Sequence, residues 1–588
     1  MKNKLLIITR FPDNYKDIIE MKYNEYDLVW LQLWPVTNID DIVSNCPTLK
    51  VIKSSDLTTN KDHFEIANEV TNISNNWWNI LGLNKYGKEW NINGLKITQI
   101  FAYEIEQVLT RVLFQYKQIT KAISLVSPNS VLFVDKTFDV NLSSEVIESC
   151  VNFSLYSHFK NFHNDINIMQ IEKSEKSINI YKNKIKLFYG KLLNKKPSFF
   201  LKLITQKLFS ISKQKKDCTI ISSSLRCLQS FEEFSGKNKI YIQNDALYTK
   251  KTNLNLLLLN IDPSSALENT LLFSFFKKIL PVIESKFYNL KTLYKKTSLF
   301  INLNNPKMYI TINVASSIEL VKLWAYKQNK VRTVWSSEGL GQPDSDLDII
   351  INSVLHPEID IERWVMSDLF SKKFSKNTKP VKVTGYFDNS INIKYRPSTK
   401  KQILFPLTSA KKFVHRAIVG EDMFEILQSI EDVCSVVSNF EDYQLIIKIH
   451  PGDSLHIPLF KQAATNNKNV KIILNGNLNE IICESHLVII SEGSTAVEAL
   501  AKGKNVICYN HTNRPSFITS IYDYVNHNPE KGAALIMTHT KLELSTEINN
   551  LLKYADLNTP SPNFDFVLEN AKIGYDVNKV VTDLINNI

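Results

Sequence analysis

The stretch HLVIISEGSTAVEALAKGKNVICYN, residues 486–510, decides the fold. An apolar strand (Leu487–Ile490) ends in Ser-Glu-Gly-Ser-Thr, and a helix-forming run starts at once from Ala496. A second apolar strand follows at 504–510. Strand, short turn, helix and strand form one unit of a parallel sheet that carries helices on its faces. The stretch therefore predicts an α/β fold of the doubly wound type.

The same signal recurs along the whole chain. Short apolar runs, each bounded by polar or turn residues, are separated by segments long enough for helices. They form three series: 4–10, 26–34, 49–55 and 129–136; then 217–224, 238–245, 307–314 and 331–339; then 380–386, 401–409, 443–451, 469–475, 486–493 and 504–510. The third series alone supplies six strands, which is enough for a complete doubly wound domain.

The length of the chain sets the number of domains. A chain of 588 residues is too long for one core and indicates roughly two to four domains. The sequence turns polar at Arg396-Pro397, before the best series of strands. We therefore predict two Rossmann-like domains: residues 1–395, enlarged by insertions, and residues 396–588, ending in a helical tail after Asn563.

Charge and composition limit the partners and the compartment. The net charge of +11 suits an anionic partner, but no basic run carries the interleaved aromatic residues of a nucleic-acid groove. The seven cysteines form no CxxC pair, which favours reduced thiols. No window approaches the ~18 apolar residues of a membrane span. We expect a cytoplasmic protein that does not bind nucleic acid.

One inserted segment has its own composition. Residues 176–216 contain twelve lysines and no acidic residue, with apolar residues interleaved at near-helical spacing. This composition is typical of a helix that lies in the plane of a membrane surface. It also fits a solvated helix that packs its apolar side on the protein. The sequence leaves both interpretations open, and the first predicts peripheral contact with the inner membrane on its cytoplasmic face.

Two strand ends in the third series carry candidate ligand-binding residues. The turn Ser491-Glu492-Gly493-Ser494-Thr495 offers glycine for close approach of the backbone and hydroxyls at the start of a helix, which favours a phosphate there. His450-Pro451 ends the strand at 445–449, and its imidazole would contact the same phosphate. Ligands of doubly wound folds bind at such carboxyl ends.

A third strand end, in the second series, carries a candidate base. The strand at 331–335 runs into Ser336-Ser337-Glu338-Gly339, followed by Leu340-Gly341. A carboxylate between a strand end and two glycines is well placed to take a proton from a bound hydroxyl. Asp344 and Asp346 also form a DxD-like pair in the polar loop that follows, but we expect no metal site there.

The order of these three motifs resembles a known group of enzymes. Strand–Glu-Gly, strand–His-Pro and strand–Ser-x-Gly-Ser-Thr–helix is similar to bacterial capsule and surface-polysaccharide glycosyltransferases of the two-Rossmann GT-B architecture. The likeness is greatest to transferases that use CMP-sialic acid or CMP-Kdo, and looser to CDP-glycerol glycerophosphotransferases. It spans about the last 260 residues, from Tyr309 on. The residue before Glu338 is Ser337, where these families have an acid.

The resemblance implies a function and roles for the motif residues. The chain would move a sugar from a nucleotide donor to a growing surface polysaccharide, such as a capsule or lipopolysaccharide, or to a glycolipid, with no metal or other cofactor. Glu338 would be the base, with Gly339 and Gly341 on the acceptor side. His450 with Pro451, Ser491, Gly493, Ser494 and Thr495 would bind the donor. Alternatives are a CDP-glycerol-type transferase, a UDP-sugar 2-epimerase-like enzyme and a non-catalytic glycan-assembly subunit.

The base assignment gives the first prediction. Glu338→Gln keeps the size of the side chain but removes its basic oxygen, so transfer should fall by about 10²–10⁴-fold while nucleotide binding persists. Parallel assays of sugar transfer and of nucleotide affinity measure the two effects separately. Asp344→Asn is the matched control. Near-normal transfer by Glu338→Gln with loss of transfer in Asp344→Asn would move the base to Asp344.

Overall fold

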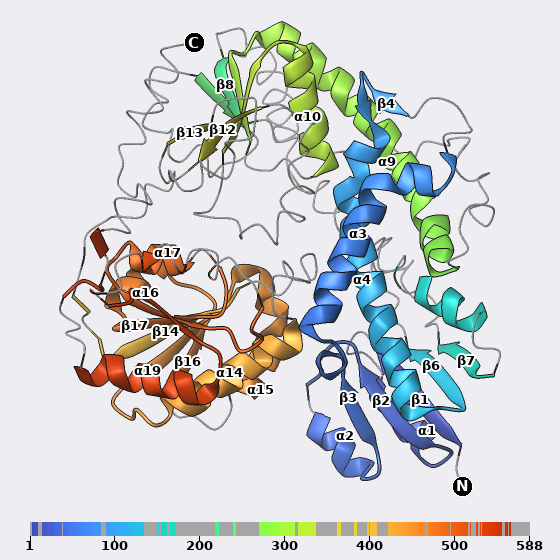
Figure 1. Ribbon diagram of the computed structural model, residues 1–588, viewed down its shortest axis with the longest axis vertical. Helices are drawn as coiled ribbons and strands as arrows, with labels where there is room; N and C mark the ends of the chain where they lie inside the picture. Colours follow the sequence, from blue (N-terminus) through green and yellow to red (C-terminus); the bar gives the residue numbers. More distant parts are fainter. Residues whose placement is uncertain are drawn as a thin grey trace, which may run out of the picture.

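A computed structural model gives the fold of the chain (Figure 1). The sheets that it describes are parallel, apart from one two-residue hairpin, and helices pack against them. The α/β fold with Rossmann-like sheets is therefore confirmed. In the described part of the chain, no helix is both long and apolar enough to cross a bilayer. The description covers these residues: 3–9, 15–37, 39–83, 90–134, 151, 154–161, 165–171, 218–222, 239–242, 270–311, 316–336, 361–365, 381–384, 395, 397–398, 400–408, 422–464, 469–493, 495–514, 518, 522, 525–526, 530, 532–554, 559–562 and 564–565.

The first sheet has the strand order β3-β2-β1-β6-β7, all parallel. Its alternate side chains face opposite layers: Leu5 and Ile7 pack with the short helices, whereas Leu6 and Ile8 face the long ones. Burial on both faces explains why these strands are almost continuously apolar. The elements are β1 (Lys4–Thr9), α1 (Tyr15–Tyr23), β2 (Asp27–Gln32), α2 (Ile39–Asn45), β3 (Lys50–Lys53), η1 (Ser54–Leu57), α3 (Asn60–Ile80), β4 (Asn91–Ile92), β5 (Leu95–Lys96), α4 (Ile97–Val126), β6 (Ser130–Val134) and β7 (Asn167–Ile171).

The second sheet has the order β13-β12-β11-β10-β8-β9, again parallel. The long helix α9 carries Pro281 in its interior and leads into the sheet, and α10 connects β10 to β11. Its elements are β8 (Cys218–Ser222), β9 (Lys239–Ile242), α9 (Thr270–Asn304), β10 (Met308–Thr311), α10 (Ser317–Gln328), β11 (Arg332–Ser336), β12 (Glu362–Val365) and β13 (Val381–Val383).

The third sheet has the order β16-β15-β14-β17-β18-β19. Counted along the chain this is 3-2-1-4-5-6, the order of dinucleotide-binding Rossmann folds. Its elements are β14 (Gln402–Pro406), α14 (Met423–Val437), β15 (Gln444–Lys448), η7 (Pro451–His456), α15 (Ile457–Ala463), β16 (Val470–Ile473), α16 (Leu478–Glu484), β17 (Leu487–Ile490), α17 (Thr495–Leu500), β18 (Asn505–Tyr509), β19 (Leu535–Thr538) and α19 (Lys541–Tyr554).

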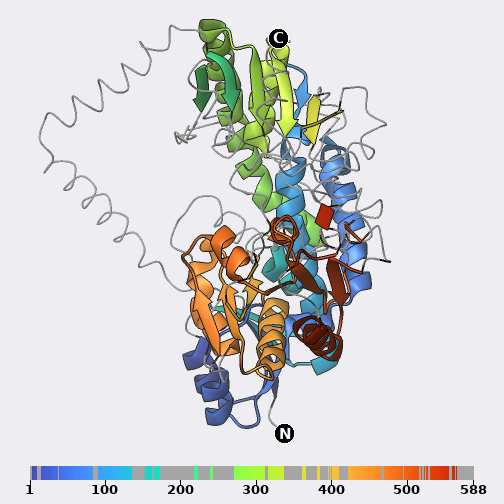
Figure 2. The ribbon, with the colours of Figure 1, turned by 90° about the vertical axis from the view of Figure 1, so that its left-hand side faces the viewer.

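The long helices join the first two sheets. One hydrophobic cluster runs from the first sheet through α3, α4, α9 and α10 to the second sheet. Polar contacts fix the same helices: Lys286 lies 2.9 Å from Glu104, and Asn93 donates to the Tyr294 hydroxyl at 2.7 Å. The two sheets lie at opposite ends of the molecule, with the third sheet beside the helices (Figure 1; Figure 2).

The described residues before 395 thus form two large parallel sheets besides the β4–β5 hairpin, where the sequence led us to expect one Rossmann-like domain with insertions. The separation lies between β7 and β8, where the chain leaves the first sheet for a second set of strands. The division into 1–395 and 396–588 stays a prediction. The basic segment 176–216 and the tail 566–588 lie outside the described residues.

Candidate functional site

The strand order of the third sheet locates its ligand-binding crevice. Chain direction across the sheet reverses between β14 and β17, and in doubly wound folds ligands bind at the carboxyl ends of the strands at that point. Thr408 follows β14 there, and Ser491, Glu492 and Gly493 follow β17. The turn that we identified in the sequence therefore lies at the switch point of the sheet.

Gly493 makes the closest approach across this switch point. Its φ is +112°, a conformation that L side chains rarely adopt, and a Cβ atom on it would lie 2.7 Å from Cγ2 of Thr408. Ser491 and Glu492 are 8% and 6% exposed, so the turn is packed rather than extended into solvent. Thr495 begins α17, whereas Ser494 lies outside the described residues. Only glycine fits between the two strand ends.

His450 lies on the other side of β14. It follows β15, is half-buried, and caps η7, whose first residue is Pro451. Its Nδ1 accepts a hydrogen bond from the Gly452 N–H at 3.1 Å, so the neutral ring carries its proton on Nε2 and donates from there. Because β14 separates β15 from β17, the strands that deliver His450 and Gly493 are about 10 Å apart.

The other charged residues that we consider at this edge, one lysine and a pair of carboxylates, form hydrogen bonds within the protein. Lys448 donates to the carbonyl oxygens of Leu474 and Ile449 at 2.7 and 3.1 Å, and burial lowers the pKa of its ammonium. At the start of α14, Asp422 and Glu425 form a reciprocal capping box with bonds of 3.0 and 2.7 Å. Phosphate commonly binds at the first helix of a Rossmann unit, but here two carboxylates occupy that position.

A buried cation connects this edge to the first part of the chain. Arg514, 3% exposed, lies in the loop after β18. Its guanidinium pairs with the Glu425 carboxylate and donates to the ring of His63 at 2.9 Å. His63 belongs to α3, and its ring packs on Phe114 with centroids 4.6 Å apart. Because the guanidinium can only donate, His63 accepts in its neutral form.

A second contact between the first-sheet part of the chain and the third sheet lies near His450. The ring of Trp34, which follows β2, lies 5.6 Å from that of His456 at the end of η7. Asn60, at the start of α3, donates to the Thr512 carbonyl at 3.0 Å. Among the described residues, the first-sheet part of the chain thus packs against the carboxyl edge of the third sheet. Sequence reasoning missed Arg514; the polar run Asn-His-Thr-Asn-Arg directly after strand β18 was the available signal.

The candidate base lies outside the described residues. Glu338, Gly339 and Gly341 follow β11, whose last residue, Ser336, is 1% exposed. Strand β11 pairs with β10 and β12 inside the second sheet. The role of Glu338 and its distance from His450 stay predictions.

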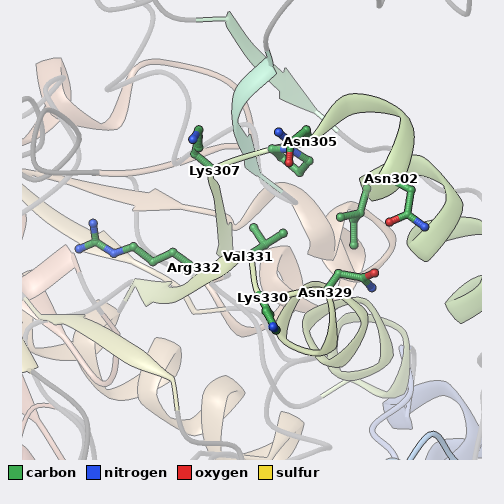
Figure 3. A pocket seen from close by; sticks show the side chains of 9 residues that line it. Asn302, Asn305, Lys307, Asn329, Lys330, Val331 and Arg332 are labelled. Carbon is green, nitrogen blue, oxygen red and sulfur yellow. The ribbon is translucent and has the colours of Figure 1, made fainter.

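One cavity lies at the second sheet rather than at the third. It encloses about 450 Å³ at the amino edge of the second sheet and is lined mainly by asparagines and cations, including Asn302, Asn305, Lys307, Lys330 and Arg332 (Figure 3). Helices α9 and α10 both end there, and helix C-termini favour cations over anions. Arg332 is already paired with Glu362 at 2.7 Å. The cavity is not the predicted donor site, because none of the predicted site residues lines it.

The packing of Gly493 against Thr408 gives a prediction. Gly493→Ala should destabilise the third sheet by about 1–3 kcal/mol of backbone strain and about 1–3 kcal/mol of overpacking. Gly476→Ala is the matched control, because it shares the positive φ (+123°) but its Cβ would meet only the flexible end of Ile481 at 3.4 Å. Hydrogen exchange in peptides covering β14 and β17 measures the difference. Thr408→Ser should restore part of the loss in Gly493→Ala, and equal effects of the two alanines would contradict the contact.

The capping box gives a pH prediction. Burial, and then the charge of Glu425, raise the pKa of Asp422 to about 7. Because the pKa is raised in the folded chain, the protonated carboxyl favours folding, and this contribution is lost as pH rises from about 4 through about 7. Asp422→Asn keeps a capping side chain that does not titrate, so its melting temperature relative to the wild type should climb over that range and then level off. Glu425→Gln, which strips Arg514 of its carboxylate, should instead destabilise at pH 7 and above by on the order of 3 kcal/mol. A pH-independent difference for Asp422→Asn would contradict the raised pKa.

Comparison with known proteins gives structural neighbours only. No family model matches the chain, and no curated protein matches its sequence. The S. aureus MnaA–UDP structure is 13% identical, with a TM-score of 0.40, over 62% of this chain and 94% of its own. UDP-GlcNAc 2-epimerase from Neisseria meningitidis bound to UDP-GlcNAc is 11% identical, with a TM-score of 0.40, over 63% and 99%. An S. aureus TarM variant in complex with fondaparinux, α-GlcNAc-glycerol and UDP is 14% identical, with a TM-score of 0.35, over 51% and 58%. Each of the three structures contains UDP or UDP-GlcNAc, and the likeness of this chain to them is one of fold alone.

Proposed function

We propose that the chain is a glycosyltransferase whose nucleotide-sugar donor binds at the carboxyl edge of the third sheet. One observation carries the proposal: the sequence motif around Gly493 lies at the switch point of a 3-2-1-4-5-6 sheet, in contact with Thr408. In doubly wound folds, ligands bind at the carboxyl ends of the strands at that point. The acidic cap on α14 directs the phosphate away from Asp422 and toward the β17 turn.

His450 is the proposed contact for the departing phosphate. Its Nδ1 is held by the Gly452 amide, so Nε2–H donates in a fixed direction from the end of β15. A donor held in place before the reaction stabilises the charge that develops on the phosphate without reorganising. The histidine would supply this stabilisation with no bound metal.

The finer assignments rest on the motifs. Glu338 is the proposed base for the acceptor hydroxyl, and a CMP-linked acidic sugar is the proposed donor. The net charge of +11 favours an anionic substrate of this kind. The acceptor would be a surface polysaccharide or glycolipid on the cytoplasmic side of the membrane. A CDP-glycerol-type transferase would use the same histidine and turn but attack phosphorus.

A thermal-shift screen of the full chain against CMP, CDP, UDP, GDP and dTDP tests the donor site. A nucleotide that binds the folded chain should stabilise it by about 2.7 kcal/mol at 100 times its dissociation constant. His450→Ala should weaken that binding on the order of tenfold or more, because a hydrogen bond to a charged group contributes about 1.5–3 kcal/mol.

The matched control is His486→Ala. His486 is also half-buried in the third sheet, but it precedes β17 at the opposite edge, 3.2 Å from the Tyr443 hydroxyl. The His486→Ala variant should be less stable than the wild type but bind nucleotide with the same affinity. Stabilisation by no nucleotide, or equal affinity in His450→Ala and the wild type, would overturn the proposed donor site. A preference for CMP would support the acidic-sugar donor, and one for CDP the glycerol-phosphate alternative.

A further inference from the structure

The last turns of α9 expose two leucines. Leu299 and Leu303 are 60% and 74% exposed and stand one helical turn apart on the same face. Single exposed leucines are ordinary in soluble proteins, but two neighbours on one helix face form a small apolar surface. The buried face of the same turns packs into the core through Leu293, Tyr294 and Ile301.

Exposed lysines lie on the same helix as these leucines and on the cavity that adjoins its end. Lys291, Lys295 and Lys296 are exposed on the preceding turns of α9, and Lys307 and Lys330 are exposed on the rim of the adjoining cavity (Figure 3). The sequence from 285 to 318 contains no acidic residue. We call Leu299, Leu303 and these five lysines the α9 patch.

We propose that the α9 patch docks the protein on an anionic membrane surface. The two leucines enter the boundary between headgroups and acyl chains, and the lysines lie against the lipid phosphates. Charge complementarity carries the choice of partner, because clustered lysines without acids gain affinity for a negative bilayer leaflet. The patch lies at the amino edge of the second sheet, away from the carboxyl edge of the third, and so is independent of the proposed donor site.

Other occupants fit this surface less well. A second copy docked patch to patch would bring five lysines against five lysines, and the repulsion would oppose it. A nucleic acid would gain little from exposed leucines, because single strands bind through aromatic stacking, and the patch has no exposed aromatic residue. An anionic bilayer satisfies both the apolar centre and the cationic border.

Cosedimentation of the full chain with vesicles tests the proposal. The wild type should bind vesicles of phosphatidylcholine with phosphatidylserine, and much less those of phosphatidylcholine alone. Each lysine near an anionic surface contributes about fivefold to partitioning, so Lys295→Gln with Lys296→Gln should weaken binding roughly 25-fold. Leu299→Ser with Leu303→Ser should also weaken it. Binding of the wild type should fall at 1 M salt, where the screening length is about 3 Å.

The matched control is Lys541→Gln with Leu542→Ser on α19, where Leu542 is 77% exposed beside an exposed lysine. It should bind vesicles like the wild type. Melting temperatures of all variants, measured without vesicles, check that the fold is intact. Wild-type binding by the two α9 variants would overturn the proposal and assign any membrane contact to another segment, such as residues 176–216. Failure of the wild type to bind anionic vesicles would also overturn it, whatever the nucleotide screen shows.

Discussion

A parallel sheet must be covered on both faces, and this constraint organises the described structure. The crossover from one parallel strand to the next returns over a face of the sheet, so each strand brings its own covering helix. In the third sheet the rule is met locally: α14, α15 and α19 pack on one face, and α16 and α17 on the other. The first two sheets share the cover of one face: α3, α4, α9 and α10 pack against both of them in a single apolar cluster. The opposite face of the first sheet packs on α1 and α2.

The sequence could predict where the strands lie, but not which sheet each strand joins. Each strand is a local apolar run, so β1 and β17 were predicted within one residue of their observed ends, and β14 within three. Sheet membership is not local. The runs at 129–136 and 217–224 look alike, yet β6 pairs with β1 whereas β8 pairs with β10. That choice depends on pairings between residues far apart in the chain, such as Ile220 of β8 with Met308 of β10.

Some residues of the candidate site could be identified from the sequence, and others only from the folded structure. His450 and Gly493 could be found because proline, glycine and histidine at strand ends have recognisable local roles. Thr408 could not, because its importance comes from a strand that pairs with β17 after about eighty residues of intervening chain. Arg514 was hidden for a similar reason. Its partners, Glu425 and His63, come from α14 and α3, and only the folded chain brings the three together.

The Arg514 cluster also constrains how the carboxyl edge of the third sheet can move. Any motion that separates α3 from this edge exposes a guanidinium that is now 3% exposed and breaks its bond to His63. Glu425 lies on the third-sheet side of that boundary, so its charge stays paired with Arg514 during such a motion. The cost of opening at this cluster is then the hydrogen bonds from Arg514 to His63 and from Asn60 to the Thr512 carbonyl, rather than a bare buried charge. The proposed glycosyltransferase would have to admit and release its donor at this edge, and a contact of modest strength would allow that motion. Trp34 and His456 form an aromatic contact close to His450, which caps η7. Movement of the first-sheet part at this boundary would therefore change the surroundings of His450, the proposed phosphate contact.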